Sequence, residues 1–162
     1  IGRRVAQLAE AFGCKVLCYS ASGHKYDSRY EQTDFDTLLA KSDFISVHAP
    51  LNAYTENLFT LDAFKKMKNT AIFINVARGA LVNEQDLYTA LTTDEIAGAA
   101  LDVLCKEPMD PENPLLKIQD STRLLITPHI AWAAKETRFR VVEEVAENIR
   151  RFQRGDTVNR VY

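Results

Sequence analysis

Short apolar runs alternate with segments of helical periodicity along most of the chain. Five runs have the length and apolar content of buried strands, and they span residues 15–19, 44–48, 71–75, 96–103 and 124–127. The segments with helical spacing of apolar residues are 3–12, 36–41, 60–67, 84–91 and 135–153. Gly13 stands where a helix-ending glycine belongs, and Thr60 where an N-cap belongs. Strands that alternate with helices form parallel sheets, so the pattern predicts an α/β fold with a doubly wound parallel sheet buried on both faces.

Composition narrows the class of protein. The chain has 162 residues, of which 46% are hydrophobic and 26% charged, as in an ordinary globular domain. Its net charge of −2 provides no basic excess for nucleic acid or an anionic membrane. No apolar run reaches the roughly 20 residues of a membrane span. Cys14, Cys18 and Cys105 have neither disulfide nor zinc-site spacing. We therefore expect a cytoplasmic protein with reduced thiols and with no metal, nucleic acid or membrane among its partners.

Charged residues follow the predicted strands at the edge where ligands bind in such sheets. Arg78, Glu107 and His129 each come shortly after an apolar run. An arginine holds a carboxylate in a two-point fork, a histidine exchanges protons near neutral pH, and a glutamate fixes the histidine tautomer. Taken singly, each has a plainer interpretation, as a turn cap, a solvated loop acid and a loop histidine with ordinary partners. Their occurrence on one edge favours a site for a substrate with a carboxylate beside an alcohol or ketone.

Three segments carry a family resemblance. Residues 75–84 (NVARGALVNE), residues 100–103 (ALDV) followed by Glu107-Pro108, and residues 127–129 (TPH) closely resemble the signatures of the D-isomer-specific 2-hydroxyacid dehydrogenases. The resemblance covers nearly the whole chain. It implies a Rossmann-type nucleotide-binding fold and an NAD(P)-dependent oxidoreductase acting on a small 2-keto or 2-hydroxy acid. Residues 130–136 are most similar to the glycerate dehydrogenase or hydroxypyruvate reductase branch, which implies hydroxypyruvate/glycerate or glyoxylate/glycolate as substrates.

The resemblance also implies roles for single residues. Arg78 binds the substrate carboxylate, His129 is the acid/base that protonates the carbonyl oxygen, and Glu107 orients His129. Trp132 lines the substrate pocket, with packing between domains as the plainer alternative.

Cofactor contacts follow from the same resemblance. The family's G-x-G-x-x-G loop is represented here only by its last two positions, Ile1 and Gly2. Ser20 stands where NAD-dependent members usually carry an acid that repels the 2′-phosphate of NADP, so NAD or NADP is expected. Lys25 and Arg29 either face that phosphate or are solvated charges. The other contacts carried over by position are Ala49, Pro50, Thr55, Val76, Ala77, Arg78, Asp102 and His129, and His48 either joins them or bonds to backbone.

The resemblance implies that the family's first strand, leading glycines and substrate domain lie outside this sequence. Residues 1–133 are then an incomplete dinucleotide-binding domain, and residues 134–162 are a helix and tail that return to the substrate domain. The full-length enzyme is expected to be a homodimer, and the isolated chain to be inactive. Two alternative functions remain: a dinucleotide-sensing corepressor or scaffold similar to the C-terminal binding proteins, and an inactive nucleotide-binding fragment.

Overall fold

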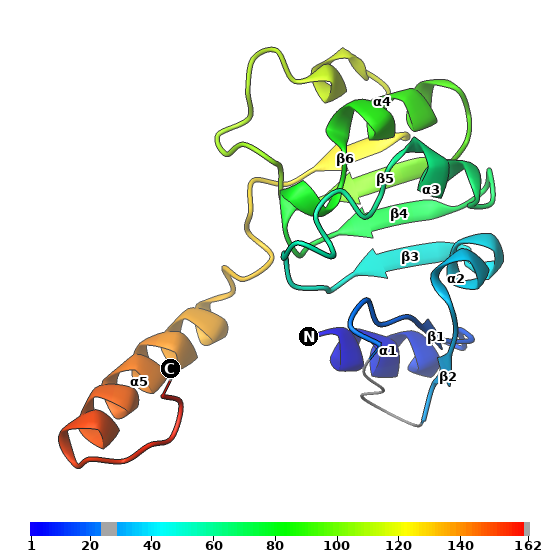
Figure 1. Ribbon diagram of the computed structural model, residues 1–162. Helices are drawn as coiled ribbons and strands as arrows, with labels where there is room; N and C mark the ends of the chain where they lie inside the picture. Colours follow the sequence, from blue (N-terminus) through cyan, green and yellow to red (C-terminus); the bar gives the residue numbers. More distant parts are fainter. Residues whose placement is uncertain (24–28, 161–162) are drawn as a thin grey trace. The chain divides into compact units, whose positions relative to one another are not determined.

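The computed structural model describes residues 1–23 and 29–160. The chain divides into two compact units at the boundary between Pro128 and His129. The first unit contains a four-stranded parallel sheet in the order β3-β4-β5-β6 (Figure 1). Its strands are β3 (Phe44–Val47), β4 (Ile72–Asn75), β5 (Gly98–Leu101) and β6 (Leu124–Ile126). The register pairs Val47 with Asn75, Asn75 with Leu101 and Leu101 with Ile126, so the four strands end at one level.

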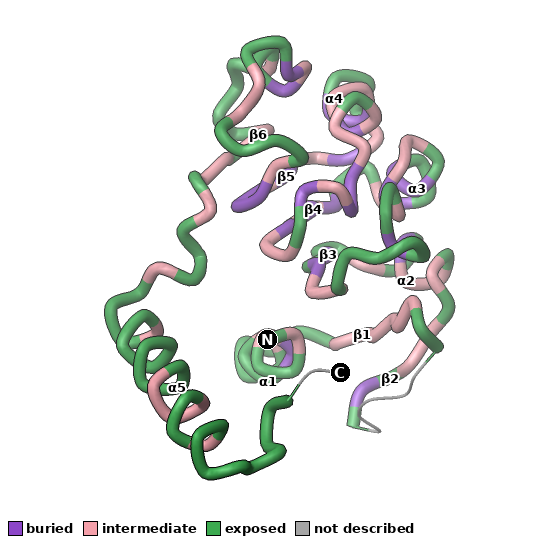
Figure 2. Tube along the Cα trace, turned by 60° about the vertical axis from the view of Figure 1, so that its left-hand side comes forward, coloured by how far each residue is buried: buried purple, intermediate pink, exposed green. Residues whose placement is uncertain are grey.

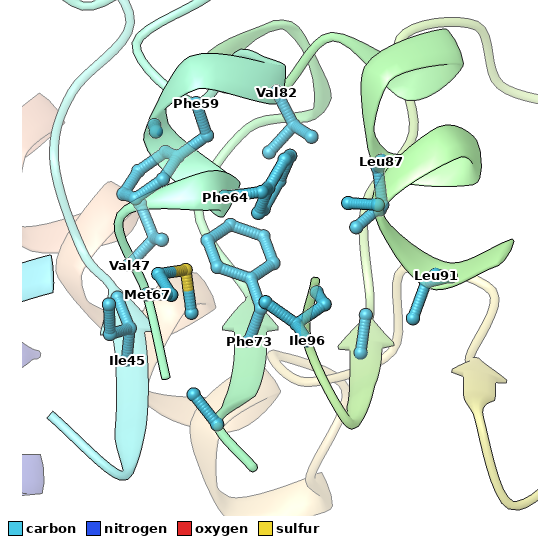
Figure 3. Packing of buried hydrophobic residues seen from close by; sticks show 14 of the residues in the cluster. Ile45, Val47, Phe59, Phe64, Met67, Phe73, Val82, Leu87, Leu91 and Ile96 are labelled. Atoms are coloured by element: carbon cyan, nitrogen blue, oxygen red, sulfur yellow. The ribbon is translucent and has the colours of Figure 1, made fainter. Parts of the chain in front are cut away.

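Helices α3 (Leu61–Lys65) and α4 (Glu84–Thr92) pack against each other on one face of this sheet (Figure 1). The core between them and the strands is rich in aromatic side chains (Figure 3). The rings of Phe64 and Phe73 meet edge to face at 5.4 Å between centroids, and both are fully buried. The other face is less covered, since Phe44 is 66% and Leu125 59% exposed. The fold class is confirmed, as a parallel sheet with flanking helices.

The prediction that all five apolar runs share one sheet is wrong. The run at 15–19 contributes only β1 (Leu17–Cys18), which pairs in parallel with β2 (Glu31–Gln32) in a separate two-stranded sheet. β2 was not predicted, because neither of its residues is apolar and its backbone pairing with β1 alone defines it.

The helix bounds agree closely with the predicted segments. Helix α1 is Gly2–Ala11, α2 is Phe35–Lys41 and α5 is Lys135–Gln153, and two short 3₁₀ helices, η1 (Gly79–Leu81) and η2 (Pro114–Lys117), were not predicted. Asp34 caps α2 by accepting from the Thr37 amide, and Asn83 caps α4 through the Asp86 amide. Gly13 has a φ of 86°, as expected after a helix end. Thr60 precedes α3 but makes no side-chain cap bond.

The second unit consists of α5 and the segments on either side of it. No residue of α5 is buried within the described structure (Figure 2). Glu147 accepts from three arginines near the helix end, Arg150, Arg151 and Arg154, and these contacts hold the pKa of its carboxyl below the ordinary value. Among the helices of the described residues, none has the length and apolar content needed to cross a membrane.

Candidate functional site

The aligned strand ends place four residues at the carboxyl edge of the sheet. His48, Val76, Asp102 and Thr127 directly follow β3, β4, β5 and β6. Asp102 is buried, its carboxylate accepts from the Thr127 hydroxyl, and its amide donates to the Asn75 carbonyl at 2.9 Å. Asp102, predicted to contact the cofactor, is therefore fixed from both neighbouring strands.

The loop after β4 is held by a residue that sequence reasoning missed. Asn75 is fully buried, and its side chain donates to the Arg78 carbonyl at 2.9 Å while accepting from the Ala77 amide at 3.0 Å. The carboxamide thus closes the turn that presents Val76, Ala77 and Arg78. The available signal was an amide residue at the end of an apolar strand, where a buried polar side chain needs hydrogen-bond partners.

Arg78 projects from this turn. Its side chain is exposed, and Nη1 donates to the Ala77 carbonyl at 2.7 Å. The next residue, Gly79, is buried against the loop that follows β5. A Cβ on Gly79 would lie 1.9 Å from the carbonyl carbon of Leu104, so the two loops touch through their backbones. Only glycine permits this approach.

Glu107 lies on that second loop. Its Oε1 accepts from the Leu104 amide at 2.9 Å, and the residue is exposed. The first unit therefore brings the loops of Arg78 and Glu107 into direct contact at Gly79. Both side chains lie near the carboxyl ends of adjacent strands, β4 and β5.

The start of α1 is suited to an anionic group. Its first turn contains no acidic residue, and no side chain caps it. A Cβ on Gly2 would lie 3.2 Å from the Cβ of His48, so the helix start packs closely beside His48. These features fit a dinucleotide phosphate, which binds backbone amides at a helix N-terminus.

His48 adds a neutral polar group beside this helix start. Its Nε2 lies 2.9 Å from the Ser46 hydroxyl. Burial lowers the pKa of the His48 imidazole. One of the two interpretations of His48 was a hydrogen bond to the backbone. The partner observed is instead the side chain of Ser46.

The loop after β3 contains Ala49, Pro50 and Thr55. Thr55 is buried, and its hydroxyl donates to the Pro50 carbonyl at 2.6 Å and accepts from the Asn52 amide at 2.9 Å. The hydroxyl therefore shapes the loop from within. Pro50 is exposed and Ala49 half-buried at the strand end.

Ser20 follows β1, and its hydroxyl lies 3.2 Å from that of Ser22. Arg29 is one of the two cations interpreted either as facing a 2′-phosphate or as solvated charges, and it forms an ion pair with Glu10 of α1 at 2.6 Å. The other of these two cations, Lys25, lies outside the described residues.

His129 and Trp132 belong to the second unit. His129 has a φ of 54°, a left-handed conformation that is uncommon for residues other than glycine and is enriched at functional sites. Trp132 is 55% exposed, and its indole Nε1 donates to the His129 carbonyl at 2.8 Å. The two residues are therefore neighbours, whereas the pairing of His129 with Glu107 stays a prediction.

Comparison with known proteins decides the family. The model of the D-isomer specific 2-hydroxyacid dehydrogenase NAD-binding domain matches residues 1–131. The chain belongs to this family. The matched region includes Arg78, Glu107 and His129, and it ends just before Trp132.

Curated proteins similar in sequence to this chain are named as reductases of small 2-keto acids. The chain is 40% identical over 159 residues to a glyoxylate reductase of Korarchaeum cryptofilum, covering 96% of this chain and 47% of that protein. It is 39% identical to a hydroxypyruvate reductase of Blautia hydrogenotrophica, covering 98% of this chain and 49% of that protein. The chain thus spans about half the length of the curated relatives it matches.

Solved structures of similar proteins share the fold. A D-lactate dehydrogenase of Lactobacillus jensenii with NAD⁺ has a TM-score of 0.87 and 33% identity, and the match covers 100% of this chain and 52% of that chain. An acyclic imino acid reductase in complex with NADPH and D-Arg has a TM-score of 0.89 and 36% identity, covering 100% of this chain and 50% of that chain. Proteins that share this fold have therefore been solved with either nicotinamide cofactor.

Proposed function

We propose that the chain is the nucleotide-binding part of an NAD(P)H-dependent D-2-hydroxyacid dehydrogenase that reduces a small 2-keto acid such as hydroxypyruvate or glyoxylate. The observation that carries the proposal is the contact between the Arg78 and Glu107 loops at Gly79, on the carboxyl edge of the sheet. Ligands bind at this edge in open parallel sheets, which supports a site that uses the Arg78 guanidinium and the Glu107 carboxylate. The names of similar family members support the substrate class.

Each proposed role follows from the chemistry of its side chain. The exposed Arg78 guanidinium binds the substrate carboxylate through two parallel hydrogen bonds. His129 donates a proton to the carbonyl oxygen, and Glu107 orients its imidazole and stabilises the protonated form. A reduced nicotinamide, when bound, supplies the hydride. Trp132, whose indole donates to the His129 carbonyl, closes one side of the substrate pocket.

The cofactor is held by the residues at the strand ends and the start of α1. The helix start binds the phosphates, and the buried Asp102 faces the nicotinamide carboxamide. Ser20 bonds to the adenosine ribose or its phosphate without repelling either, so both NADH and NADPH are used. The ion pair of Arg29 with Glu10 weakens the expected attraction of this loop for NADP, because a 2′-phosphate has to compete with a carboxylate.

The test is a steady-state assay of the complete enzyme, in which this chain is joined to the remaining length that its relatives possess. NADH and NADPH oxidation is followed with hydroxypyruvate, glyoxylate and hydroxyacetone, the last as a matched ketone without a carboxylate. We expect turnover of the two acids, and a kcat/KM for hydroxyacetone at least about 100-fold lower, because the Arg78 contact is lost. Equal use of hydroxyacetone would contradict the role of Arg78. Binding of dinucleotide without turnover of any acid would favour the corepressor or scaffold.

We further propose that residues 1–133 form the nucleotide-binding domain and residues 134–162 connect to the substrate domain. The 162-residue chain alone is then expected to reduce no 2-keto acid, because a second domain is needed to complete the cleft and exclude water. Steady NADH or NADPH oxidation by the purified chain with hydroxypyruvate would contradict this. A homodimeric, cytoplasmic enzyme stays a prediction.

A further inference from the structure

We propose that Glu84 is a positioning residue that holds the Glu107 loop in place against the Arg78 loop. Its catalytic consequence rests on the proposed function, whereas the structural contact does not. We use the term Glu84 cluster for three residues, Glu84, Cys105 and Asn113. They join the start of α4 to both ends of the segment that carries Glu107.

The two carboxylate oxygens of Glu84 bind two different parts of the chain. Oε1 accepts from the Cys105 amide at 2.8 Å, and Oε2 accepts from the Asn113 side-chain amide at 2.7 Å. Asn113 is buried, and its Oδ1 accepts from the Leu115 amide at 3.0 Å. One carboxylate thus holds the beginning and the end of the segment between Cys105 and Asn113.

Glu84 lies at the start of a capped helix. It is the first residue of α4, and the Asn83 side chain caps this helix by accepting from the Asp86 amide at 3.0 Å. A carboxylate at this position is favoured by the helix dipole. The Cys105 amide and the Asn113 side-chain amide both donate to Glu84. A glutamine at position 84 has only one acceptor oxygen, so its NH₂ group would face one of these two N–H donors and that hydrogen bond would be lost. The cluster therefore requires an acid.

The pKa of the Cys105 thiol is affected by the same Glu84 carboxylate. Burial and the neighbouring Glu84 carboxylate raise its pKa to about 11. The protonated thiol lies 3.6 Å from the Val82 carbonyl, in the segment between η1 and α4. A second contact thus joins the Glu107 loop to the segment that follows Arg78.

The cluster is placed to set the distance between two proposed functional groups. Glu107 is fixed to its own loop by the Leu104 amide, and Leu104 touches Gly79 next to Arg78. Movement of the Cys105–Asn113 segment therefore moves Glu107 relative to Arg78. A displacement of about 1 Å is enough to lower catalytic rates about 100-fold.

The structural test is hydrogen–deuterium exchange of the complete enzyme with Glu84→Gln. The matched control is Asp86→Asn, in the same first turn of α4, which loses a carboxylate that accepts from the Leu61 amide at 3.0 Å. We expect exchange across residues 104–113 to accelerate at least about tenfold in Glu84→Gln and less than about twofold in Asp86→Asn. Unchanged exchange in Glu84→Gln, or equal acceleration in both variants, would overturn the proposal.

A second variant guards against failure of Glu84→Gln to fold. Asn113→Asp keeps the oxygen that accepts from the Leu115 amide and replaces the donor toward Glu84 with a second carboxylate. The like charges are expected to repel and to accelerate exchange in the same segment. Protection equal to that of the wild type would overturn the proposed role of this contact.

The catalytic readout separates positioning from general damage. In Glu84→Gln we expect kcat/KM for the 2-keto acid to fall about tenfold or more with cofactor affinity unchanged within about twofold. The loss is expected in kcat rather than in KM, because Arg78 keeps its contact with the substrate carboxylate. A loss that appears in KM alone, with kcat unchanged, would overturn positioning. Faster exchange in an enzyme whose wild type reduces no 2-keto acid would support the Glu84 cluster and overturn the proposed function.

Discussion

The loops of Arg78 and Glu107 differ from the loop of Ser20 in how they are held. The first two follow four-residue strands in the interior of the sheet, and they are fixed by Asn75, Gly79 and Glu84. Ser20 follows a two-residue strand, and its described hydroxyl contact is with Ser22, two positions along the same loop.

This difference separates two tasks. Proton transfer and carboxylate binding need groups held within about 0.5 Å of a working geometry, and buried hydrogen bonds supply that constraint. Cofactor choice needs only a favourable or unfavourable charge near the ribose, which a surface loop provides and can change without altering the core. We therefore expect substitutions near the first loops to lower the rate strongly and substitutions in the second to alter preference.

The largest effect is expected from His129→Gln in the complete enzyme. Loss of the proton donor should lower turnover about 10² to 10⁴-fold while cofactor affinity stays nearly unchanged. Steady-state kinetics and cofactor titration of the purified variant measure both quantities. A fall of less than about tenfold would remove His129 from acid/base catalysis.

The second-largest effect is expected from Gly79→Ala, with a loss of about 100-fold in kcat/KM. A Cβ at position 79 would lie 1.9 Å from Leu104 and would force the Arg78 and Glu107 loops apart. The free energy of unfolding should also fall by about 1–3 kcal/mol. Gly98→Ala in β5 is the control, since its Cβ would approach no atom closer than 3.1 Å. If chemical denaturation and kinetics show similar changes in both variants, the contact at Gly79 does not position the site.

Arg78→Lys should lower kcat/KM about 10- to 100-fold, with a higher KM and a lower kcat. An ammonium cannot form the planar two-point contact with a carboxylate. Kinetics with hydroxypyruvate over a range of concentrations separate the two parameters. Unchanged values for both would exclude Arg78 from carboxylate binding.

The smallest effect is expected from Ser20→Asp, which should shift the ratio of catalytic efficiencies toward NADH by about tenfold through repulsion of the 2′-phosphate. Ser22→Asp is the matched control. It adds the same charge to the same loop, at a side chain whose hydroxyl lies 3.2 Å from that of Ser20, and it keeps Ser20 itself. A strong NADH preference already present in the wild type would mean that other residues determine cofactor choice.

Much of this organisation could be predicted from the sequence. Apolar runs predicted the strands of the main sheet, and helical spacing predicted α5 at its observed bounds. The loop positions of Arg78 and Glu107 followed from strand ends alone. These features depend on local periodicity, which the sequence shows directly.

The remaining features depend on contacts between distant segments. β2 is defined by pairing with β1, and the Glu84 cluster by hydrogen bonds to residues far along the chain. The ion pair of Arg29 with Glu10 likewise required the fold to bring α1 beside β2. The spacing of apolar residues does not indicate which side chains form hydrogen bonds to other loops. The sequence therefore did not predict that Asn75 and Glu84 hold the loops in place.

Chiral analysis of the product tests the central claim most directly. The complete enzyme is incubated with a reduced nicotinamide cofactor and hydroxypyruvate, and the glycerate formed is resolved into its enantiomers. The proposed site predicts D-glycerate from the wild type, and at least about 100-fold less of it per unit time from His129→Gln. L-glycerate, a racemic product, or equal yields from the two proteins would contradict the account.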